Sequence, residues 1–278
     1  MYIQKIKKTA ITFFSFLLLS AMATGTASAA ENKKTIDYVA LGDSLAAGQK
    51  PTELGSVSTK LYGTSYPKFI RDELSGKGML SSYANFGKSG YQTGHVIYDL
   101  NYDNVTIEAI KGAEIITLDI GANDLFSQLQ AEEGDVSQWL TPTNIQGLID
   151  QVDLLLLNPG AFYYLTSQVT TIVTKIQSVN SDAKIYLMGY YDAFSFLEGY
   201  TDDPELQPKI NDLRGKLQVL ITACNTALQG VQGVTYVDTT IAMGGKSNPN
   251  AMTYLPLDIH PTVQGYRAIA QAFLDAMK

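Results

Sequence analysis

A serine and a histidine near opposite ends of the chain have the chemistry needed for nucleophilic catalysis. Ser44 lies in the sequence Gly-Asp-Ser-Leu, directly after the apolar run Ile36 to Leu41, where a strand would end and a helix begin. A serine hydroxyl needs a base to take its proton, and imidazole, with an unperturbed pKa of about 6.5, suits that task. His260 is one of two histidines, and Asp258 precedes it by two residues. Ser44, His260 and Asp258 are therefore a candidate catalytic triad.

Two further segments place glycine and asparagine after expected strands. One is Asn85-Phe86-Gly87-Lys88-Ser89-Gly90, and the other is Gly121-Ala122-Asn123-Asp124. The four blocks GDSL, NxGxSG, GAND and DxHP, in this order, resemble those of the SGNH hydrolases, the GDSL-type esterases and lipases. The blocks extend from Gly42 to Pro261, and the agreement of four ordered blocks makes the resemblance specific.

The resemblance implies a role for each matching residue. Ser44 would be the nucleophile and His260 the base, and the oxyanion donors would be the backbone N–H groups of Ser44 and Gly90 and the side-chain amide of Asn123. The residue types agree with these roles, because a glycine backbone can approach a ligand closely and an asparagine amide offers two neutral N–H donors. Asp258 would orient the ring of His260, as the acid does in the general triad.

The last block departs from the commonest family pattern, in which the acid lies three residues before the histidine. That position is Leu257 here, and the acid is Asp258. A shorter turn could still bring Asp258 to Nδ1 of the ring, or a backbone carbonyl could hold the tautomer while Asp258 serves as an ordinary turn residue.

Other motif residues also have structural interpretations. The GDS run could cap a helix, Gly90 and Gly121 could be turn glycines, and Asn123 could cap a helix over 124–129. The four blocks together favour catalysis. His95, shortly beyond the second block, could contact substrate, but a polar residue early in a helix is the favoured interpretation.

The N-terminal residues are typical of a secretory signal peptide. Three lysines precede an apolar stretch from Ala10 to Met22, and Ala27-Ser28-Ala29 has the form of a cleavage site. We expect residues 1–29 to be removed, residues 30–278 to form one hydrolase domain, and the mature protein to be secreted. The removed segment carries three lysines and no acids, so the formal net charge of −7 becomes −10.

This acidic balance argues against nucleic acid as a partner and for at most transient contact with membranes. Cys224 is the only cysteine, so no disulfide can form within the chain, and its place on an apolar helical stripe favours a buried position. Two histidines and one cysteine, widely separated, do not form a zinc site of ordinary spacing. We therefore expect neither a metal nor a cofactor.

Short apolar runs alternate with helical patterns along the chain. This alternation predicts a three-layer α/β/α sandwich with a central, mostly five-stranded parallel sheet, which is flavodoxin-like and is also the fold that the resemblance implies. We expect long loops over 49–64, 190–204 and 244–257. The expected strands are 36–41, 83–86, 114–120, 184–188 and 234–237, and the expected helices are 66–74, 105–111, 144–179 with a break at 159–160, 206–229 and 263–277.

These observations predict a secreted, cofactor-free serine hydrolase that cleaves carboxylic esters through an acyl-enzyme intermediate. Its substrate would be a small-molecule or lipid ester, as for an esterase, lipase or lysophospholipase. The segment Tyr190 to Tyr200 holds five aromatic residues and could form a wall for an acyl chain, stack on a sugar, or pack as ordinary core. The alternatives are a carbohydrate or peptidoglycan O-deacetylase and a catalytically weak module that binds a lipid or glycan.

Overall fold

The computed structural model describes residues 35–50, 61–129, 136–244, 252–255 and 258–278, and a parallel sheet lies at its centre. The strands are short and rich in Ile, Val, Leu and Tyr, as expected for strands covered on both faces. The sheet is five-stranded, in the order β4 (Leu80–Asn85), β1 (Ile36–Gly42), β5 (Ile115–Asp119), β6 (Lys184–Met188) and β7 (Thr235–Val237).

The order of the strands creates a switch point in the middle of the sheet. In sequence order the strands read 2-1-3-4-5, which is the flavodoxin-like arrangement, and every neighbouring pair is parallel. Chain connections leave β1 and β5 toward opposite sides, so a crevice opens beyond their carboxyl ends. The predicted fold class is confirmed, and the Ser44 and Asn123 blocks follow the two strands at this switch point.

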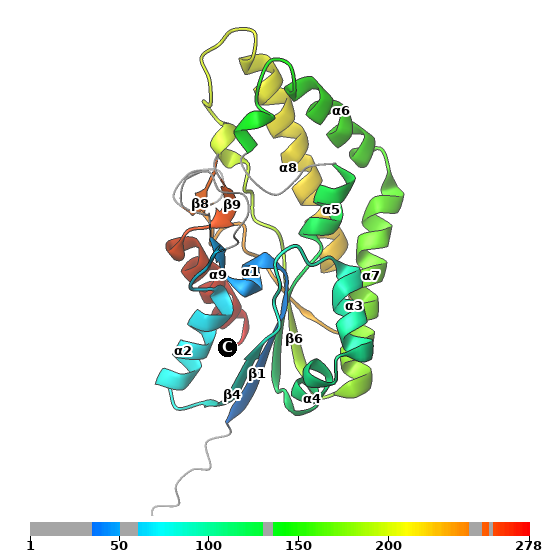
Figure 1. The fold of residues 1–278 in the computed structure, drawn as a ribbon, viewed down its shortest axis with the longest axis vertical. Helices are drawn as coiled ribbons and strands as arrows, with labels where there is room; N and C mark the ends of the chain where they lie inside the picture. Colours follow the sequence, from blue (N-terminus) through cyan, green and yellow to red (C-terminus); the bar gives the residue numbers. More distant parts are fainter. Residues whose placement is uncertain (1–34, 51–60, 130–135, 245–251, 256–257) are drawn as a thin grey trace, which may run out of the picture. The chain divides into compact units, whose positions relative to one another are not determined.

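Helices cover both faces of the sheet (Figure 1). The pair α2 (Tyr66–Gly76) and α9 (Val263–Ala276) packs on one face. The other face is covered by α3 (Thr93–Tyr102), α4 (Asn104–Gly112), α7 (Pro159–Val179) and α8 (Gln207–Gln229), and α6 (Ile145–Leu156) packs on α8.

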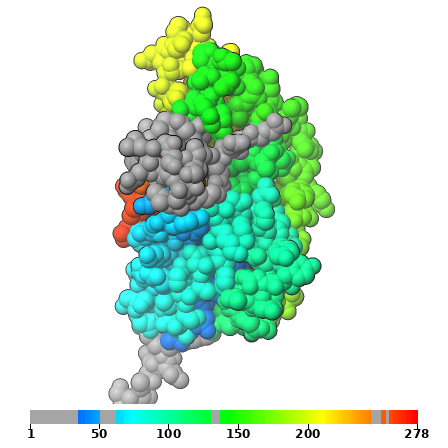
Figure 2. Space-filling model, in the orientation of Figure 1, coloured from blue at the N-terminus to red at the C-terminus, as the bar shows by residue number. Residues whose placement is uncertain are grey.

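Alternating strand residues supply the two hydrophobic cores, because successive side chains of a strand point to opposite faces. Val39 and Leu41 contribute to the core under α3, α7 and α8, whereas Tyr38 and Ala40 contribute to the core under α2 and α9. In the space-filling view, atoms of α2 (cyan) and of α3 and α4 (blue-green) lie at the surface of the molecule (Figure 2). Helices thus cover both faces of the sheet, and the outer strand β4 keeps exposed residues.

Some elements differ from the sequence prediction. The helices α1 (Ser44–Ala47), α3 and α5 (Ala122–Gln128) follow the first three motif blocks; the sequence indicated a helix start at each place, but none of the three was among the expected helices. The remaining elements are the ribbon of β2 (Gln49–Lys50) with β3 (Leu61–Tyr62), the ribbon of β8 (Thr253–Tyr254) with β9 (Asp258–Pro261), and the 3-10 turns η1 (Val136–Gln138) and η2 (Ser195–Leu197).

The expected loops are partly ordered by these elements. β2 and β3 pair across the first, η2 lies within the second, and residues 51–60, 245–251 and 256–257 of the first and third lie outside the described residues. Within the described ranges, no helix has the length and apolar character that a membrane span requires.

Candidate active site

Ser44 begins the short helix α1 immediately after β1. Asp43 is the N-cap of this helix, and its carboxylate accepts a hydrogen bond from the backbone N–H of Leu45 at 3.0 Å. Gly42 pairs with Asp119 so closely that an added Cβ would lie 2.2 Å from the Asp119 carboxylate. The helix-cap interpretation of the GDS run is therefore correct for Asp43, and it places Ser44 at the carboxyl edge of the sheet.

A buried carboxyl group supports the Ser44 turn from below. Asp119, at the end of β5, is 1% exposed, and its Oδ2 accepts from the backbone N–H of Ala46 at 3.2 Å. Its Oδ1 accepts from the hydroxyl of Tyr66. Burial, followed by the neighbouring Asp43 carboxylate, raises the pKa of Asp119 well above its usual range. Sequence reasoning missed this residue, although an acid inside the run Ile-Thr-Leu-Asp-Ile was a visible signal.

His260 lies on β9 with Asp258 directly against its ring. Oδ1 of Asp258 lies 2.5 Å from Nδ1 of His260 and also accepts from the backbone N–H of His260 at 2.8 Å. His260 as a whole is 2% exposed. Its other nitrogen, Nε2, is buried and makes no hydrogen bond to any residue in the described ranges, Ser44 included. Nε2 is therefore available to a hydroxyl that approaches from the pocket.

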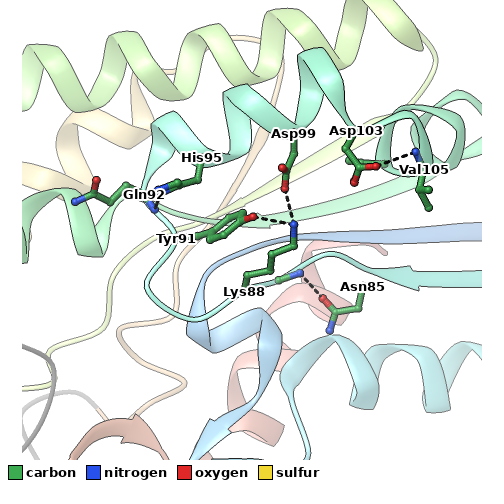
Figure 3. A network of polar contacts seen from close by, with 10 residues as sticks. Asn85, Lys88, Tyr91, Gln92, His95, Asp99, Asp103 and Val105 are labelled. Carbon is green, nitrogen blue, oxygen red and sulfur yellow. Dashed lines mark hydrogen bonds and ion pairs between the residues drawn. The ribbon is translucent and has the colours of Figure 1, made fainter. Parts of the chain in front are cut away.

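Gly90 occupies a turn that requires its backbone conformation. The N–H of Tyr91 donates to the carbonyl of Lys88 at 3.1 Å, and Gly90, at the third position of this turn, has φ +77°. A positive φ at that position is the mark of a type II turn. The Lys88 ammonium reaches from the turn to the Tyr91 hydroxyl at 2.7 Å and to Asp99 on α3 at 2.9 Å (Figure 3). Both interpretations of Gly90 are thus compatible, because a turn glycine can also present its N–H.

The asparagine of the third block joins that block to the second. Nδ2 of Asn123 donates to the carbonyl of Tyr91 at 2.9 Å, and the Gln92 amide donates to the carbonyl of Asn123 at 3.2 Å. An amide nitrogen carries two hydrogens, so one remains for a ligand. The N-cap of α5 is Gly121, and Asn123 lies inside the helix. The alternative that Asn123 is a helix cap is therefore wrong.

His95 has a structural role at the start of α3. Its Nδ1 accepts from the backbone N–H of Gln92 at 3.0 Å, which completes a capping box, and its ring stacks on Tyr91. The favoured interpretation of His95 as a residue early in a helix is confirmed.

One pocket brings three of the candidate residues together. Ser44, Asn123 and His260 all line it, whereas Gly90 is not among its lining residues. The aromatic segment after β6 contributes both to the pocket wall and to the core. Tyr190, Tyr191 and Phe194 line the pocket, and Phe196 is buried in the core. The Tyr191 hydroxyl also donates to the carbonyl of Ile259, beside His260, at 3.3 Å.

The comparison with protein families agrees with this geometry. Residues 40–268 match the model of the GDSL-like Lipase/Acylhydrolase family. The match covers most of the chain, and the chain therefore belongs to this family of lipases and esterases. No curated protein matches the chain.

Solved structures share the fold at low sequence identity. The extracellular lipase from Streptomyces rimosus matches with a TM-score of 0.57 and 19% identity, covering 86% of this chain and 99% of that one. Phospholipase A1 from Streptomyces albidoflavus matches with a TM-score of 0.57 and 18% identity, covering 86% and 97%. The lipase Lip_vut3 from a goat rumen metagenome gives 0.55 and 19%, covering 87% and 97%.

Proposed function

We propose that this protein hydrolyses carboxylic esters through an acyl-enzyme on Ser44. The observation that carries the proposal is the shared pocket, in which a serine after β1 faces the same space as a histidine whose Nδ1 is bound to a carboxylate and whose Nε2 has no hydrogen-bond partner in the described residues. Nucleophile, base and orienting acid are the three parts that acyl transfer by serine requires.

In the proposed reaction, Oγ of Ser44 bonds to the ester carbonyl carbon while its proton passes to Nε2 of His260. The carbonyl π electrons move to the oxygen. When the tetrahedral intermediate collapses, the bond to the alcohol oxygen breaks, and His260 returns the proton to that oxygen. Water then repeats the sequence on the acyl-enzyme, releasing the carboxylic acid and free Ser44.

The oxyanion needs donors that are fixed before it forms, because reorganisation during the reaction would raise the barrier. We assign the backbone N–H groups of Ser44 and Gly90 and the remaining amide hydrogen of Asn123. Two hydrogen bonds favour this assignment. The Tyr91 N–H donates to the carbonyl of Lys88 and closes the turn that holds Gly90, and Nδ2 of Asn123 donates to the carbonyl of Tyr91. Each such donor typically lowers the barrier by about 2.7–4 kcal/mol.

Replacing the nucleophile tests the proposal directly. Ser44→Ala should fold normally and lose at least about 10⁴-fold in kcat on p-nitrophenyl butyrate, because triad removal leaves only the oxyanion donors and substrate binding. Ser178→Ala, an exposed serine on α7, is the matched control and should keep full activity.

Labelling separates an enzyme from a binding module. A serine-directed phosphonate should modify the wild-type protein once, at Ser44, and should leave Ser44→Ala unlabelled. Substantial turnover by folded Ser44→Ala, or an unlabelled wild-type protein that still binds ester, would refute the catalytic role of Ser44.

We also propose that the protein is exported and acts on small-molecule or lipid esters outside the cell. Two features of the sequence support this proposal: the apolar segment from Ala10 to Met22, which three lysines precede, and the sequence Ala27-Ser28-Ala29. When a secreting bacterial host expresses the full chain, the protein in the medium should begin at Ala30. Recovery only of uncleaved, cell-bound protein would contradict export.

A further inference from the structure

The pocket beside Ser44 continues to a wall formed by α8. Leu217, Leu220, Ile221 and Cys224 line it, and their spacing of i, i+3, i+4 and i+7 places them on one helix face. The α5 residues Leu125, Phe126 and Leu129 also line the pocket. Apart from the residues at the catalytic side, the lining is almost wholly apolar, which suits a hydrocarbon chain and not a sugar.

The size of this pocket limits the chain that it can accept. Its volume is about 110 Å³. A dry apolar cavity of about 150 Å³ holds benzene, with six carbons, so this pocket has room for roughly four carbons. Packed interiors resist displacement of the helices, so a longer acyl chain would have to leave this space through the open side of the pocket.

Cys224 contributes only volume to the wall. It is 1% exposed, and burial raises the pKa of its thiol to about 12, so the group is neutral at ordinary pH. It is also the smallest of the four α8 residues that line the pocket. A larger side chain at this position would therefore reduce the space for substrate.

We propose that this pocket binds the acyl group of a short-chain ester, with about four carbons as the optimum, and that Ile221 and Cys224 on α8 set the upper limit of chain length. The inference rests on the proposed function, because it places the acyl group beside Ser44. It goes further by assigning the substrate class and the residues that select it.

The inference is tested by one variant that enlarges a side chain of the pocket wall and one that shortens such a side chain. We compare kcat/KM for p-nitrophenyl acetate, butyrate, octanoate and laurate. The wild-type protein should prefer butyrate over octanoate by at least about 10-fold, since one misfitting methylene changes the barrier by about 1–3 kcal/mol. Cys224→Leu should reduce the butyrate-to-acetate ratio about 10-fold, and Ile221→Ala should raise the octanoate-to-butyrate ratio about 10-fold.

An exposed position on the same helix supplies both controls. Val219 is 57% exposed, so Val219→Leu and Val219→Ala repeat the two kinds of change on α8 outside the pocket and should leave all ratios unchanged. A structural disturbance would lower all rates together, whereas chain-length selection changes the ratios in opposite directions. A wild-type preference for octanoate or laurate, or unchanged ratios in both pocket variants, would overturn the inference.

Overpacking destabilises a packed core, so if Cys224→Leu does not fold, Ile221→Ala carries the test alone. A binding measurement separates the inference from the proposed function. In Ser44→Ala, butyrate ester should raise Tm more than the octanoate ester, because a ligand that binds only the folded state stabilises it. If the wild-type protein hydrolyses no ester but the butyrate ester still gives the larger Tm shift, the proposed function fails and the assignment of the pocket to a short acyl group stands. If the octanoate ester gives the larger shift, that assignment fails.

Discussion

Asp258 reaches the ring of His260 because the two residues form a side-chain turn. Aspartate commonly accepts a hydrogen bond from the backbone N–H two residues later. Asp258 does so at 2.8 Å, and the same oxygen lies 2.5 Å from Nδ1 of the ring. The two-residue spacing therefore fixes the carboxylate and the imidazole together. The family's usual acid position, Leu257, lies outside the described residues.

Removing the charge of Asp258 should impair catalysis without disturbing the fold. If Asp258 holds the tautomer and stabilises the protonated ring, Asp258→Asn should lower kcat by up to about 10⁴-fold, as in the general triad. The measurement is kcat on p-nitrophenyl butyrate together with a thermal unfolding curve.

Asp238 provides a matched control, since its carboxylate accepts from the backbone N–H of Thr240 at 2.8 Å in the same kind of turn but faces no histidine. Asp238→Asn should keep full activity. A loss of less than about 10-fold in Asp258→Asn would instead favour a Ser44–His260 dyad.

At the scale of elements, the second and third blocks form one unit through the start of α3. The Asp124 carboxylate on α5 accepts from the backbone N–H of Thr93 at 2.9 Å and from its hydroxyl at 2.5 Å. Thr93 is fully buried. These bonds, with those of Asn123 to Tyr91 and of Gln92 to Asn123, fix the segment after Gly90 against α5.

Thr93→Val should therefore affect both stability and catalysis. It keeps the shape but leaves a buried carboxylate oxygen without its hydroxyl donor, which should cost about 1–3 kcal/mol in the free energy of unfolding. Because the Gly90 turn leads into this helix, kcat should also fall. Urea unfolding and ester hydrolysis measure the two effects.

The matched control lies at the start of α4, where the buried Thr106 donates its hydroxyl to Asp103 at 2.7 Å. Thr106→Val should lower stability less, because water can reach the partly exposed Asp103 carboxylate, and should leave kcat unchanged. Equal effects of both variants on kcat would show that the Thr93 contact has no special connection with the oxyanion site.

Sequence patterns predicted the strands better than the helices around the site. Each expected strand is present with small shifts at its ends, because apolar runs of this length are buried in a parallel sheet. For α3 only a helix start near His95 was anticipated and no bounds were predicted. Gly94 weakens the helical pattern there, and the contacts that fix the first turn come from Gln92 locally and from Asp124 on another element. Local propensity does not contain that second contact.

At the scale of the whole molecule, the motif order and the strand alternation were sufficient to predict the sheet and the edge at which the Ser44 and Asn123 blocks lie. The order of parallel strands places the ends of β1 and β5 side by side, so the Ser44 and Asn123 blocks had to meet there. The support beneath them was not predictable in the same way. Asp119 contacts Tyr66 and Ala46, which lie 53 and 73 residues earlier in the chain, and no local pattern indicates such pairs.

Asp119 should make the stability of the whole molecule depend on pH in an unusual direction. Its folded-state pKa is raised above the ordinary value of 3.8, first by burial and then by Asp43. Above about pH 4 the unfolded state has lost a proton that the folded state keeps, so the free energy of unfolding falls as pH rises, by at most about 1.4 kcal/mol per pH unit, until the folded carboxyl group ionises. The stabilisation from Asp119 is fully present at pH values below 3.8, the pKa of the carboxyl group in the unfolded state. It decreases as pH rises above that value.

Asp119→Asn removes this titration while keeping an oxygen that can accept from the α1 backbone. The difference in unfolding free energy, variant minus wild type, should therefore increase as pH rises above about 4, until the folded carboxyl group ionises, because only the wild-type protein loses stability through this group. Urea unfolding at several pH values measures the difference, and Asp150→Asn, an exposed carboxylate on α6, controls for the loss of one charge. Parallel curves for the wild type and Asp119→Asn would mean that Asp119 is ionised beneath Ser44, with its charge balanced by the Tyr66 hydroxyl and the α1 N–H groups.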